Sequence, residues 1–481
     1  MTEFRPEFVC DEIGTKLFSS LKSLFSSQKC HFCVLFVTLG GIFFPDAELR
    51  ATFADMETKL SLRLDNASNI YPASLTKRYA SIYRLSVTLS ESVNVNILQQ
   101  ALVNTIKRIP TFGCTLKNGF FWWYLSTLEK MPVVSKYTGI GVRGFRFHGG
   151  FLFKVMVDGN RIILDVFHAI ADGHGGQTFL LTLAGEYIRM RYKTGISYDS
   201  LVLDPNDTPK SCETDDSFRN FSGKKGSLEQ DETAYHISGK KICCQALKGE
   251  RMEISAADIK AAVAQSGYTV TDFLAAAMLD ALQQEHRHNR KRHKRNNLKI
   301  NVPVDLRRLF EGRTLRNYSS YVNLGVDVSN GYYSFDELIQ IVAAQKALKT
   351  LPSELEKKIA ANVALEDNMA ISLIPRCIKR FAIDTICRLK GDKLSSYTIS
   401  NLGNVVLPEQ MRPYITSMDF VLGRQRGTSG AASCVGYDGK IVLWMTRNIV
   451  ENKFEHFFAE ILREHGIAVD VVSEEIGASL S

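Results

Sequence analysis

The amino-acid sequence predicts an α/β protein made of two domains or of two halves of one fold, and three observations lead to this prediction. A strand-like stretch at 83–89 is followed by helical spacing at 94–108. A β-hairpin pattern at 151–167 leads into an amphipathic helix pattern at 179–192. The chain has 481 residues, which is more than one hydrophobic core usually organises.

The first strand and the first helix have clear patterns. From Tyr83 to Leu89, apolar and polar residues alternate with the period of a strand. The stretch from Asn94 to Arg108 has helical spacing instead, with apolar residues at Val95, Leu98, Leu102, Val103 and Ile106. Pro110 ends this helix, because proline cannot continue the hydrogen-bonding pattern.

The hairpin is the feature from which the functional prediction starts. Phe151 to Val157 alternates, 158–160 supplies the turn (Asp-Gly-Asn), and Arg161 to Phe167 returns. His168 follows at the end of the returning strand, and we expect the next helix to begin near Thr178.

His168 is the candidate catalytic residue. A neutral imidazole at the end of a rigid strand can take a proton from a hydroxyl group near neutral pH. Asp172, one turn later, is better placed to hold the loop by pairing with a cation than to act as a second base. Gly173 is expected to allow a backbone conformation that a Cβ would forbid. The alternative is that His168 is a structural histidine with no chemical role.

The segment His168-Ala-Ile-Ala-Asp172-Gly173 resembles the HxxxDG signature of the CoA-dependent acyltransferase superfamily, and the closest resemblance is to bacterial alcohol acetyltransferase-like and condensation-domain-like proteins. This resemblance implies two chloramphenicol-acetyltransferase-like subdomains, each a mixed sheet with helices, and an active-site channel between them. The resemblance to the superfamily is continuous from Leu64 onwards. Phe167 stands where condensation domains carry a second histidine, and the DFGWG motif of the plant branch is absent.

Two later motifs also match this superfamily. Asp305-Leu-Arg307 resembles its DxR segment, which implies that Arg307 pairs with Asp172. The segment 396–403 resembles a strand that leads to a tight turn near the channel. Ser400 and Asn401 in this segment are candidate substrate-binding residues that can donate a hydrogen bond to an oxyanion, although a plain turn is an equal alternative.

The second half continues the α/β pattern. We expect a strand at 245–254, a helix capped by Ser255, and a helix at 271–285. Helices at 355–368 and 378–389, a hairpin at 434–444 and a helix at 453–464 follow.

The expected domain organisation has four parts. Residues 56–196 form the N-terminal subdomain with the HxxxDG motif, 197–240 a polar, surface-lying crossover linker, and 241–475 the C-terminal subdomain. Residues 1–55 are an atypical extension with an apolar run at 32–44, which is too short for an ordinary membrane span. Three interpretations remain: sequence upstream of a natural start at Met56, which we favour, a packed extra element, or a membrane anchor.

Composition excludes several functional classes. The 45% hydrophobic and 23% charged residues are ordinary for a globular protein. Much of the formal charge of +8 lies in a basic cluster at 287–295, and no motif of a nucleic-acid-binding fold accompanies it. The aromatic run at 120–124 is expected to pack internally, because no basic residues are interleaved with it.

The ten cysteines have no regular spacing, which favours reduced thiols over disulfide bonds. Cys30-His-Phe-Cys33 could bind a metal ion only with a second pair of ligands, and no such pair accompanies it, so we predict no metal site.

These inferences predict a cytoplasmic, monomeric O-acyltransferase. His168 would act as general base in moving an acyl group, expected to be acetyl, from CoA to a hydroxyl of a small molecule or lipid. Acetyl-CoA or another acyl-CoA is the co-substrate, and no bound cofactor or nucleic acid is expected. Association with a membrane is an open alternative that we do not favour. The alternatives are a condensation-like enzyme that uses a carrier-protein thioester and a non-catalytic binding protein that keeps the fold.

Overall fold

The computed structural model describes residues 60–476, except 77–78, 138, 140–147, 228–230, 243–246, 265–266, 290–294 and 390. The chain divides into two units, 1–58 and 59–481, and only the second is described below. The predictions for the N-terminal extension, for the Cys30–Cys33 motif and for most of the basic cluster lie outside the described residues.

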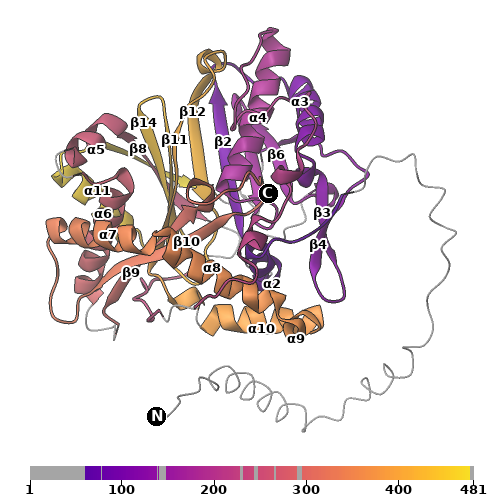
Figure 1. Ribbon diagram of the computed structural model, residues 1–481. Coiled ribbons are helices and arrows are strands. Elements are labelled where there is room, and N and C mark those ends of the chain that lie inside the picture. Colours follow the sequence, from indigo (N-terminus) through magenta and orange to yellow (C-terminus); the bar gives the residue numbers. More distant parts are fainter. Residues whose placement is uncertain are drawn as a thin grey trace. The chain divides into compact units, whose positions relative to one another are not determined.

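The largest sheet has seven strands, all from the second half of the chain (Figure 1). Its order is β10 (Ser319–Asp327), β9 (Asn297–Asp305), β11 (Tyr397–Val405), β13 (Gly430–Tyr437), β14 (Lys440–Arg447), β8 (Lys248–Ser255) and β15 (Val469–Glu475). β11 is parallel to both neighbours and the other pairs are antiparallel, so the sheet is mixed.

The second sheet combines strands from both halves of the chain. Its order is β12 (Ile415–Leu422), β2 (Ile82–Leu89), β7 (Arg161–Phe167), β6 (Phe153–Asp158) and β5 (Ser135–Lys136). β12 pairs with β2 over most of its length, although the two strands are more than 300 residues apart in the sequence. The expected halves are therefore joined by a strand that leaves the second half and completes the sheet of the first.

A small antiparallel sheet contains β1 (Ser61–Arg63), β4 (Trp123–Thr127) and β3 (Cys114–Asn118). The longer helices are α3 (Val95–Arg108), α4 (Gly173–Tyr192), α6 (Val270–Asn289), α7 (Phe335–Lys349), α8 (Pro352–Asp367), α10 (Arg376–Leu389) and α11 (Lys453–Glu464). The shorter helices are α2 (Ile70–Ser74), α5 (Ala256–Val263) and α9 (Met369–Ser372). In Figure 1, α3 and α4 lie beside the five-stranded sheet, and α6, α7 and α11 lie together beside the seven-stranded sheet.

Two hydrophobic cores stabilise these layers. The first is built mainly from residues 64–202, and it also takes in β12 side chains such as Met418 and Phe420. The second is built from residues 218–469 around α6, which buries nearly all of its apolar side chains. A mixed α/β fold with two cores follows, because each sheet has an apolar face that must be covered.

Local patterns were reliable guides to most elements. The hairpin β6–β7, the helix α3 and the hairpin β13–β14 occur where the sequence predicts them. The segment from Ser396 does not lead to a tight turn. It continues as β11 to Val405, with an irregularity between Asn401 and Asn404, so that prediction was wrong.

The helix after the hairpin begins earlier than expected. α4 starts at Gly173 rather than near Thr178, because Asp172 caps it by accepting a hydrogen bond from the Gly175 N–H. A Cβ on Gly175 would lie 1.9 Å from the carbonyl oxygen of Leu315, and one on Gly176 would lie 2.4 Å from the Tyr83 hydroxyl. The glycine pair therefore allows close packing inside the first turns of α4.

The predicted crossover linker, residues 197–240, is more buried than its polar composition suggests. Phe218, Phe221 and Tyr235 from this segment are buried in the second core. Glu213 accepts two hydrogen bonds from the buried Arg108 guanidinium, at 2.5 and 2.7 Å. Scattered apolar residues and one buried ion pair thus anchor a stretch that the sequence alone predicts to lie on the surface.

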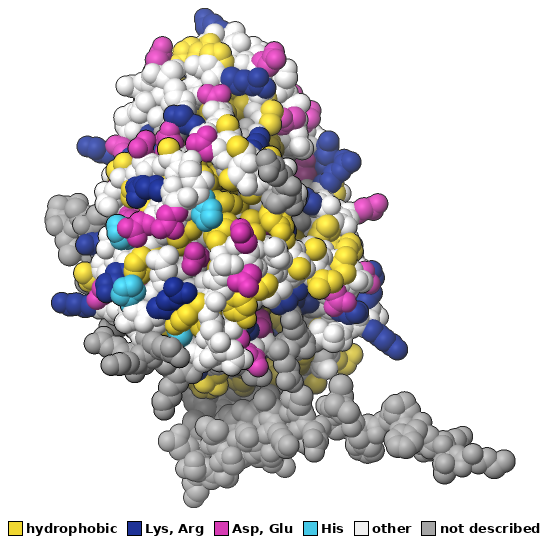
Figure 2. Space-filling view, turned by 90° about the vertical axis from the view of Figure 1, so that its left-hand side faces the viewer, with side chains coloured by type: hydrophobic (Ala, Val, Ile, Leu, Met, Phe, Trp, Pro, Cys, Tyr) yellow, Lys and Arg dark blue, Asp and Glu magenta, His cyan; other side chains and the backbone are white. Residues whose placement is uncertain are grey.

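The visible surface has mixed charge. On the face shown in Figure 2, the described Lys and Arg side chains are interspersed with Asp and Glu side chains. In the described part of the chain, none of the helices combines the length and the hydropathy needed to cross a bilayer. The five cysteines whose state is described, Cys114, Cys212, Cys377, Cys387 and Cys434, are free thiols.

Candidate active site

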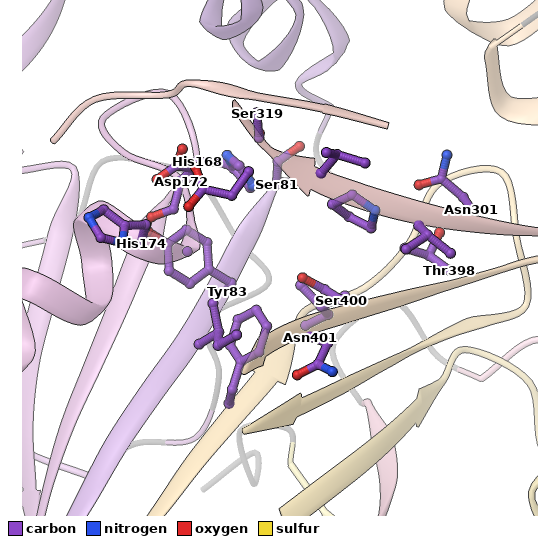
Figure 3. Close-up of a pocket in the computed structure, with 18 of the residues that line it drawn as sticks. Ser81, Tyr83, His168, Asp172, His174, Asn301, Ser319, Thr398, Ser400 and Asn401 are labelled. Carbon is purple, nitrogen blue, oxygen red and sulfur yellow. The ribbon is translucent and has the colours of Figure 1, made fainter. Parts of the chain in front are cut away.

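His168 lies directly after β7, at the edge of a cavity of about 560 Å³ (Figure 3). Its backbone N–H donates to the carbonyl oxygen of Ser81, which fixes the turn to the start of β2. The imidazole stacks on the Tyr71 ring, with the ring centroids 4.5 Å apart. It also makes an edge-to-face contact with the Tyr83 ring, with the centroids 5.2 Å apart. These contacts hold the ring in one orientation while it lines the cavity.

Asn317 determines which nitrogen of His168 carries the proton. Its Nδ2 lies 2.9 Å from the backbone carbonyl oxygen of His168, and because a carbonyl can only accept, the amide nitrogen must face it. The amide oxygen therefore faces the imidazole, and Oδ1 lies 2.9 Å from Nδ1. Nδ1 must donate to this oxygen, so the neutral ring keeps its lone pair on Nε2.

A buried network supports Asn317 from behind. Its Nδ2 also donates to Ser68 Oγ at 2.8 Å, and Ser68 Oγ donates to Asp65 Oδ1 at 2.5 Å. The Ser68 N–H donates to the same Asp65 oxygen at 2.8 Å. We call His168, Asn317, Ser68 and Asp65 the imidazole network. It connects the turn that carries His168 to the segment just before α2, and α2 itself supplies Tyr71.

The surroundings favour a neutral His168. Burial lowers the pKa of the imidazole below its ordinary value. The negative charge of Asp172 and the hydrogen bonds of the imidazole with the backbone and with Asn317 as acceptors oppose this effect only in part. The free-base form that can accept a proton is therefore the dominant form near neutral pH.

Asp172 forms an ion pair with Arg307, and both residues line the cavity. Arg307 Nη1 donates to Asp172 Oδ2 at 2.8 Å, and the Tyr318 N–H donates to the same oxygen at 2.9 Å. Oδ1 accepts from Gly175 N–H at 3.1 Å and from Arg307 Nη2 at 3.3 Å. Burial would raise the pKa of Asp172, but the Arg307 charge and these donors hold it below its usual value. The pairing that the resemblance implied between these two residues is present in the structure.

Arg307 uses every donor of its guanidinium. Besides Asp172, it donates to Asp305 Oδ1 at 3.0 Å and to the carbonyl oxygens of Thr314 and Arg316 at 2.9 and 2.7 Å. Five N–H groups thus make five hydrogen bonds, which a lysine in this place could not do. We call Asp172 and Arg307, with these partners, the ionic clamp.

Gly173 has a different role from the one the sequence indicates. Its φ angle is not positive, so the predicted need for conformational freedom was wrong. A Cβ at this position would lie 2.7 Å from Cδ2 of Leu402, a residue that lines the cavity. The glycine is therefore explained by the close approach of β11 rather than by its backbone angle.

The cavity is lined by residues from both cores. β2 and the His168 turn form one side together with the start of α4, and β9, β10, β11 and β12 line much of the remainder, with single residues from α2, α6 and α7. Figure 3 shows side chains of His168, Asn301 and Ser400 arranged around a common space. Ser400 and Asn401, the candidate substrate-binding residues, both line it. The Asn401 side chain is already engaged: Nδ2 donates to Thr271 Oγ1 at 3.2 Å, and Oδ1 accepts from Gly403 N–H at 2.8 Å.

Sequence reasoning missed several residues of the site. Asn317 lies shortly after the DxR segment, which pointed only to Arg307, and Tyr71 and Ser68 lie in the segment where the resemblance begins. His174 is a further cavity-lining residue, and burial lowers its pKa, with an additional contribution from Arg307. Among the described residues, no group of three or more His, Cys, Asp or Glu side chains has the geometry of a metal site.

No protein-family model matches the sequence, and no curated protein matches it. Solved structures with a similar fold are found. The chain is similar to polyketide synthase associated protein 5 from Mycobacterium tuberculosis, with 15% identity, a TM-score of 0.55, and coverage of 83% of this chain and 97% of that one. TRI101 from F. graminearum, complexed with ethyl coenzyme A, matches with 9% identity, a TM-score of 0.56, and coverage of 87% and 100%.

The epimerization domain from the third module of tyrocidine synthetase B also matches, with 12% identity, a TM-score of 0.54, and coverage of 85% of this chain and 95% of that domain. Identities this low establish the fold alone. The chain thus has the mixed α/β fold shared by CoA-dependent acyltransferases and condensation or epimerization domains, which confirms the predicted fold class.

Proposed function

We propose that this protein transfers an acyl group from a CoA thioester to a hydroxyl acceptor, with Nε2 of His168 as the general base. The observation that carries the proposal is the orientation of Asn317. It requires the proton on Nδ1 and so leaves Nε2 unprotonated, on an imidazole that lines a cavity.

The proposed reaction needs no covalent acyl-enzyme. Nε2 takes the proton of the acceptor hydroxyl, whose oxygen then forms a bond to the thioester carbonyl carbon. The tetrahedral intermediate collapses by breaking the carbon–sulfur bond, and Nε2–H returns the proton to the leaving thiolate. Much of the rate comes from fixing both substrates beside one base, and the base itself typically contributes 10² to 10⁴-fold.

Cavity donors are available for the oxyanion of the intermediate. Ser400 and Asn401 line the cavity on β11, across from the His168 turn. Because Asn401 Nδ2 has two hydrogens and donates one to Thr271, the other is free for a substrate oxygen. We assign these two residues to the acyl carbonyl in the proposed complex.

The ionic clamp has a structural part in this mechanism. It fixes Asp172, and with it the start of α4 and the turn that carries His168, while its carboxylate has no unused oxygen facing the imidazole network. A neighbour in fold supports the choice of donor, since TRI101 from F. graminearum was crystallised in complex with coenzyme A and the small molecule deoxynivalenol. We infer acetyl-CoA as the first donor to test and a small-molecule or lipid alcohol as the acceptor.

An assay of thiol release tests the proposal. Purified protein is mixed with acetyl-CoA and a panel of alcohols, and free CoA is measured with a thiol reagent. We expect alcohol-dependent release, together with an acetyl ester detectable by mass spectrometry. If release is the same with and without His168, the general-base role is wrong.

A carrier-bound thioester is the second candidate donor, because condensation and epimerization domains share the fold at similar TM-scores. Replacing acetyl-CoA by an acetylated carrier protein in the same assay separates the two. Faster transfer from the carrier would assign the chain to condensation-like chemistry.

A further inference from the structure

The helix α10 turns its apolar side away from the described part of the protein. An amphipathic helix on a globular protein usually packs its apolar side on the core. In α10, Phe381, Ile386 and Leu389 are 75%, 59% and 62% exposed. The residues that α10 does bury are Lys379 and Cys387. Exposed apolar side chains in such a row usually mark an interaction site.

These side chains form one surface. Ile378, Phe381, Ile386 and Leu389 recur at helical spacing, so they lie on one side of α10. Met369 and Leu373, 76% and 61% exposed, lie on α9 and the turn that leads into α10. We call these six residues the α10 apolar face. Figure 1 shows α9 and α10 in succession along one edge of the molecule.

The helix is fixed in this orientation. Lys379 Nζ, on its inner side, donates to the carbonyl oxygens of Ser372 and Phe121 at 2.9 and 3.3 Å, and it lies 3.4 Å from the Trp122 ring centroid. Asp384 accepts from Arg426 Nη1 at 2.7 Å. Because polar contacts tie down the inner side, α10 cannot rotate to bury its apolar side without losing them.

The charge of α10 indicates what covers the face. Arg380 and Arg388 are exposed, whereas Lys379 is on the buried inner side. The single carboxylate of α10, Asp384, is only partly exposed and pairs with Arg388 and Arg426, which leaves an excess of positive charge on the exposed part of the helix. This excess contrasts with the interspersed charges of the surface in Figure 2. An apolar side combined with excess arginine and lysine is the composition of helices that lie in the interface of a membrane with anionic lipids.

We propose that the α10 apolar face docks on a lipid bilayer that contains anionic lipids. The apolar side chains insert among the lipid tails near the headgroups, and Arg380 and Arg388 lie at the level of the lipid phosphates. A twofold dimer through the same face fits less well, because it would place two positively charged helices against each other. The proposal does not depend on the acyl-transfer reaction.

Docking through α10 would bring the candidate active site close to the lipid. α10 packs against α2, which carries the Tyr71 ring that stacks on His168. Asp384 also binds Arg426, which adjoins the cavity-lining residues Arg424 and Gln425.

Vesicle co-sedimentation with the full chain tests the proposal. Phosphatidylcholine vesicles with and without phosphatidylglycerol are used, and we expect binding that requires phosphatidylglycerol and weakens with salt.

Variants of α10 sharpen this test. Phe381→Gln should lower the partition coefficient of the protein between vesicles and solution by roughly tenfold. Arg380→Gln should lower it by about fivefold on anionic vesicles. Matched controls are Val472→Gln on the exposed part of β15 and Lys260→Gln on the exposed side of α5, which should leave it unchanged.

The full chain keeps residues 1–58 in every variant, so a difference between variants reports on α10 itself. Melting curves of each variant verify folding. The proposal is overturned if the chain does not bind anionic vesicles, or if Phe381→Gln binds them as the unaltered protein does. It is also overturned if light scattering shows that Phe381→Gln converts a dimer into a monomer, because the face would then join two copies.

Discussion

Two polar groups lie side by side at the wall of the cavity, and they have different roles. The ionic clamp ends on the carboxylate of Asp172, whereas the imidazole network ends on the ring of His168. Both groups include hydrogen bonds with the segment 314–318. In the clamp, Arg307 donates to two carbonyl oxygens of this segment, and in the network, Asn317 of the same segment binds His168. The clamp fixes the position of the catalytic turn, and the network fixes the proton on its imidazole. Position and protonation should therefore be separable by mutation.

The largest effect is expected at the end of the imidazole network. His168→Ala should lower kcat for acyl transfer by about 10³ to 10⁴-fold, because no other group takes the hydroxyl proton. The melting temperature should change little, since the ring lines a cavity. Steady-state kinetics and a thermal melt check both points. Substantial residual activity would mean that the base is another residue, and His174 would then be examined first.

Asn317→Ala should have the next largest effect on the reaction. Without Oδ1 as acceptor, the imidazole no longer favours the Nδ1-protonated form, and we expect a loss in kcat of about 10 to 10²-fold with little change in KM. A shift in tautomer populations should be visible by ¹⁵N NMR of the imidazole. Equal losses in kcat and in folded protein would contradict a role in protonation.

Arg307→Met tests the other group. It leaves the buried carboxylate of Asp172 without its partner, which typically costs about 3–5 kcal/mol of unfolding free energy. The folded fraction at low temperature should keep most of its kcat, unlike Asn317→Ala. In a double-mutant cycle, Asp172→Asn should cost less in the Arg307→Met background than in the unaltered protein. Additive costs would show that the two residues are not coupled.

The smallest effect concerns pH. Activity should rise with pH as His168 loses its proton, and because burial lowers its pKa, the midpoint in kcat/KM should lie below the ordinary value of about 6.5. The hydrogen bond with Asn317 raises this pKa, so Asn317→Ala should move the midpoint to still lower pH. A midpoint above 6.5 in the unaltered protein would contradict the buried, neutral imidazole.

Local patterns and one motif predicted many of the secondary-structure elements and part of the candidate site. The hairpin β6–β7, the helix α3 and the turn of β13–β14 depend on neighbouring residues, so periodicity and turn chemistry specify them. The pairing of Asp172 with Arg307 came from the resemblance rather than from spacing, because 135 residues separate the two. Asn317 could not be found in this way, since a single asparagine between Arg316 and Tyr318 has no periodic signal.

The sequence by itself determined the types of most elements, the fold class and the position of His168 at the end of a strand. The tertiary structure decided the rest. It brought β12 to β2, placed Oδ1 of Asn317 against Nδ1 of His168, and left the apolar side of α10 exposed. The physical reason is that hydrophobic periodicity and turn residues act over a few positions along the chain. The proton on an imidazole and the exposure of a helix face depend instead on contacts between residues far apart in sequence, which only the folded chain brings together.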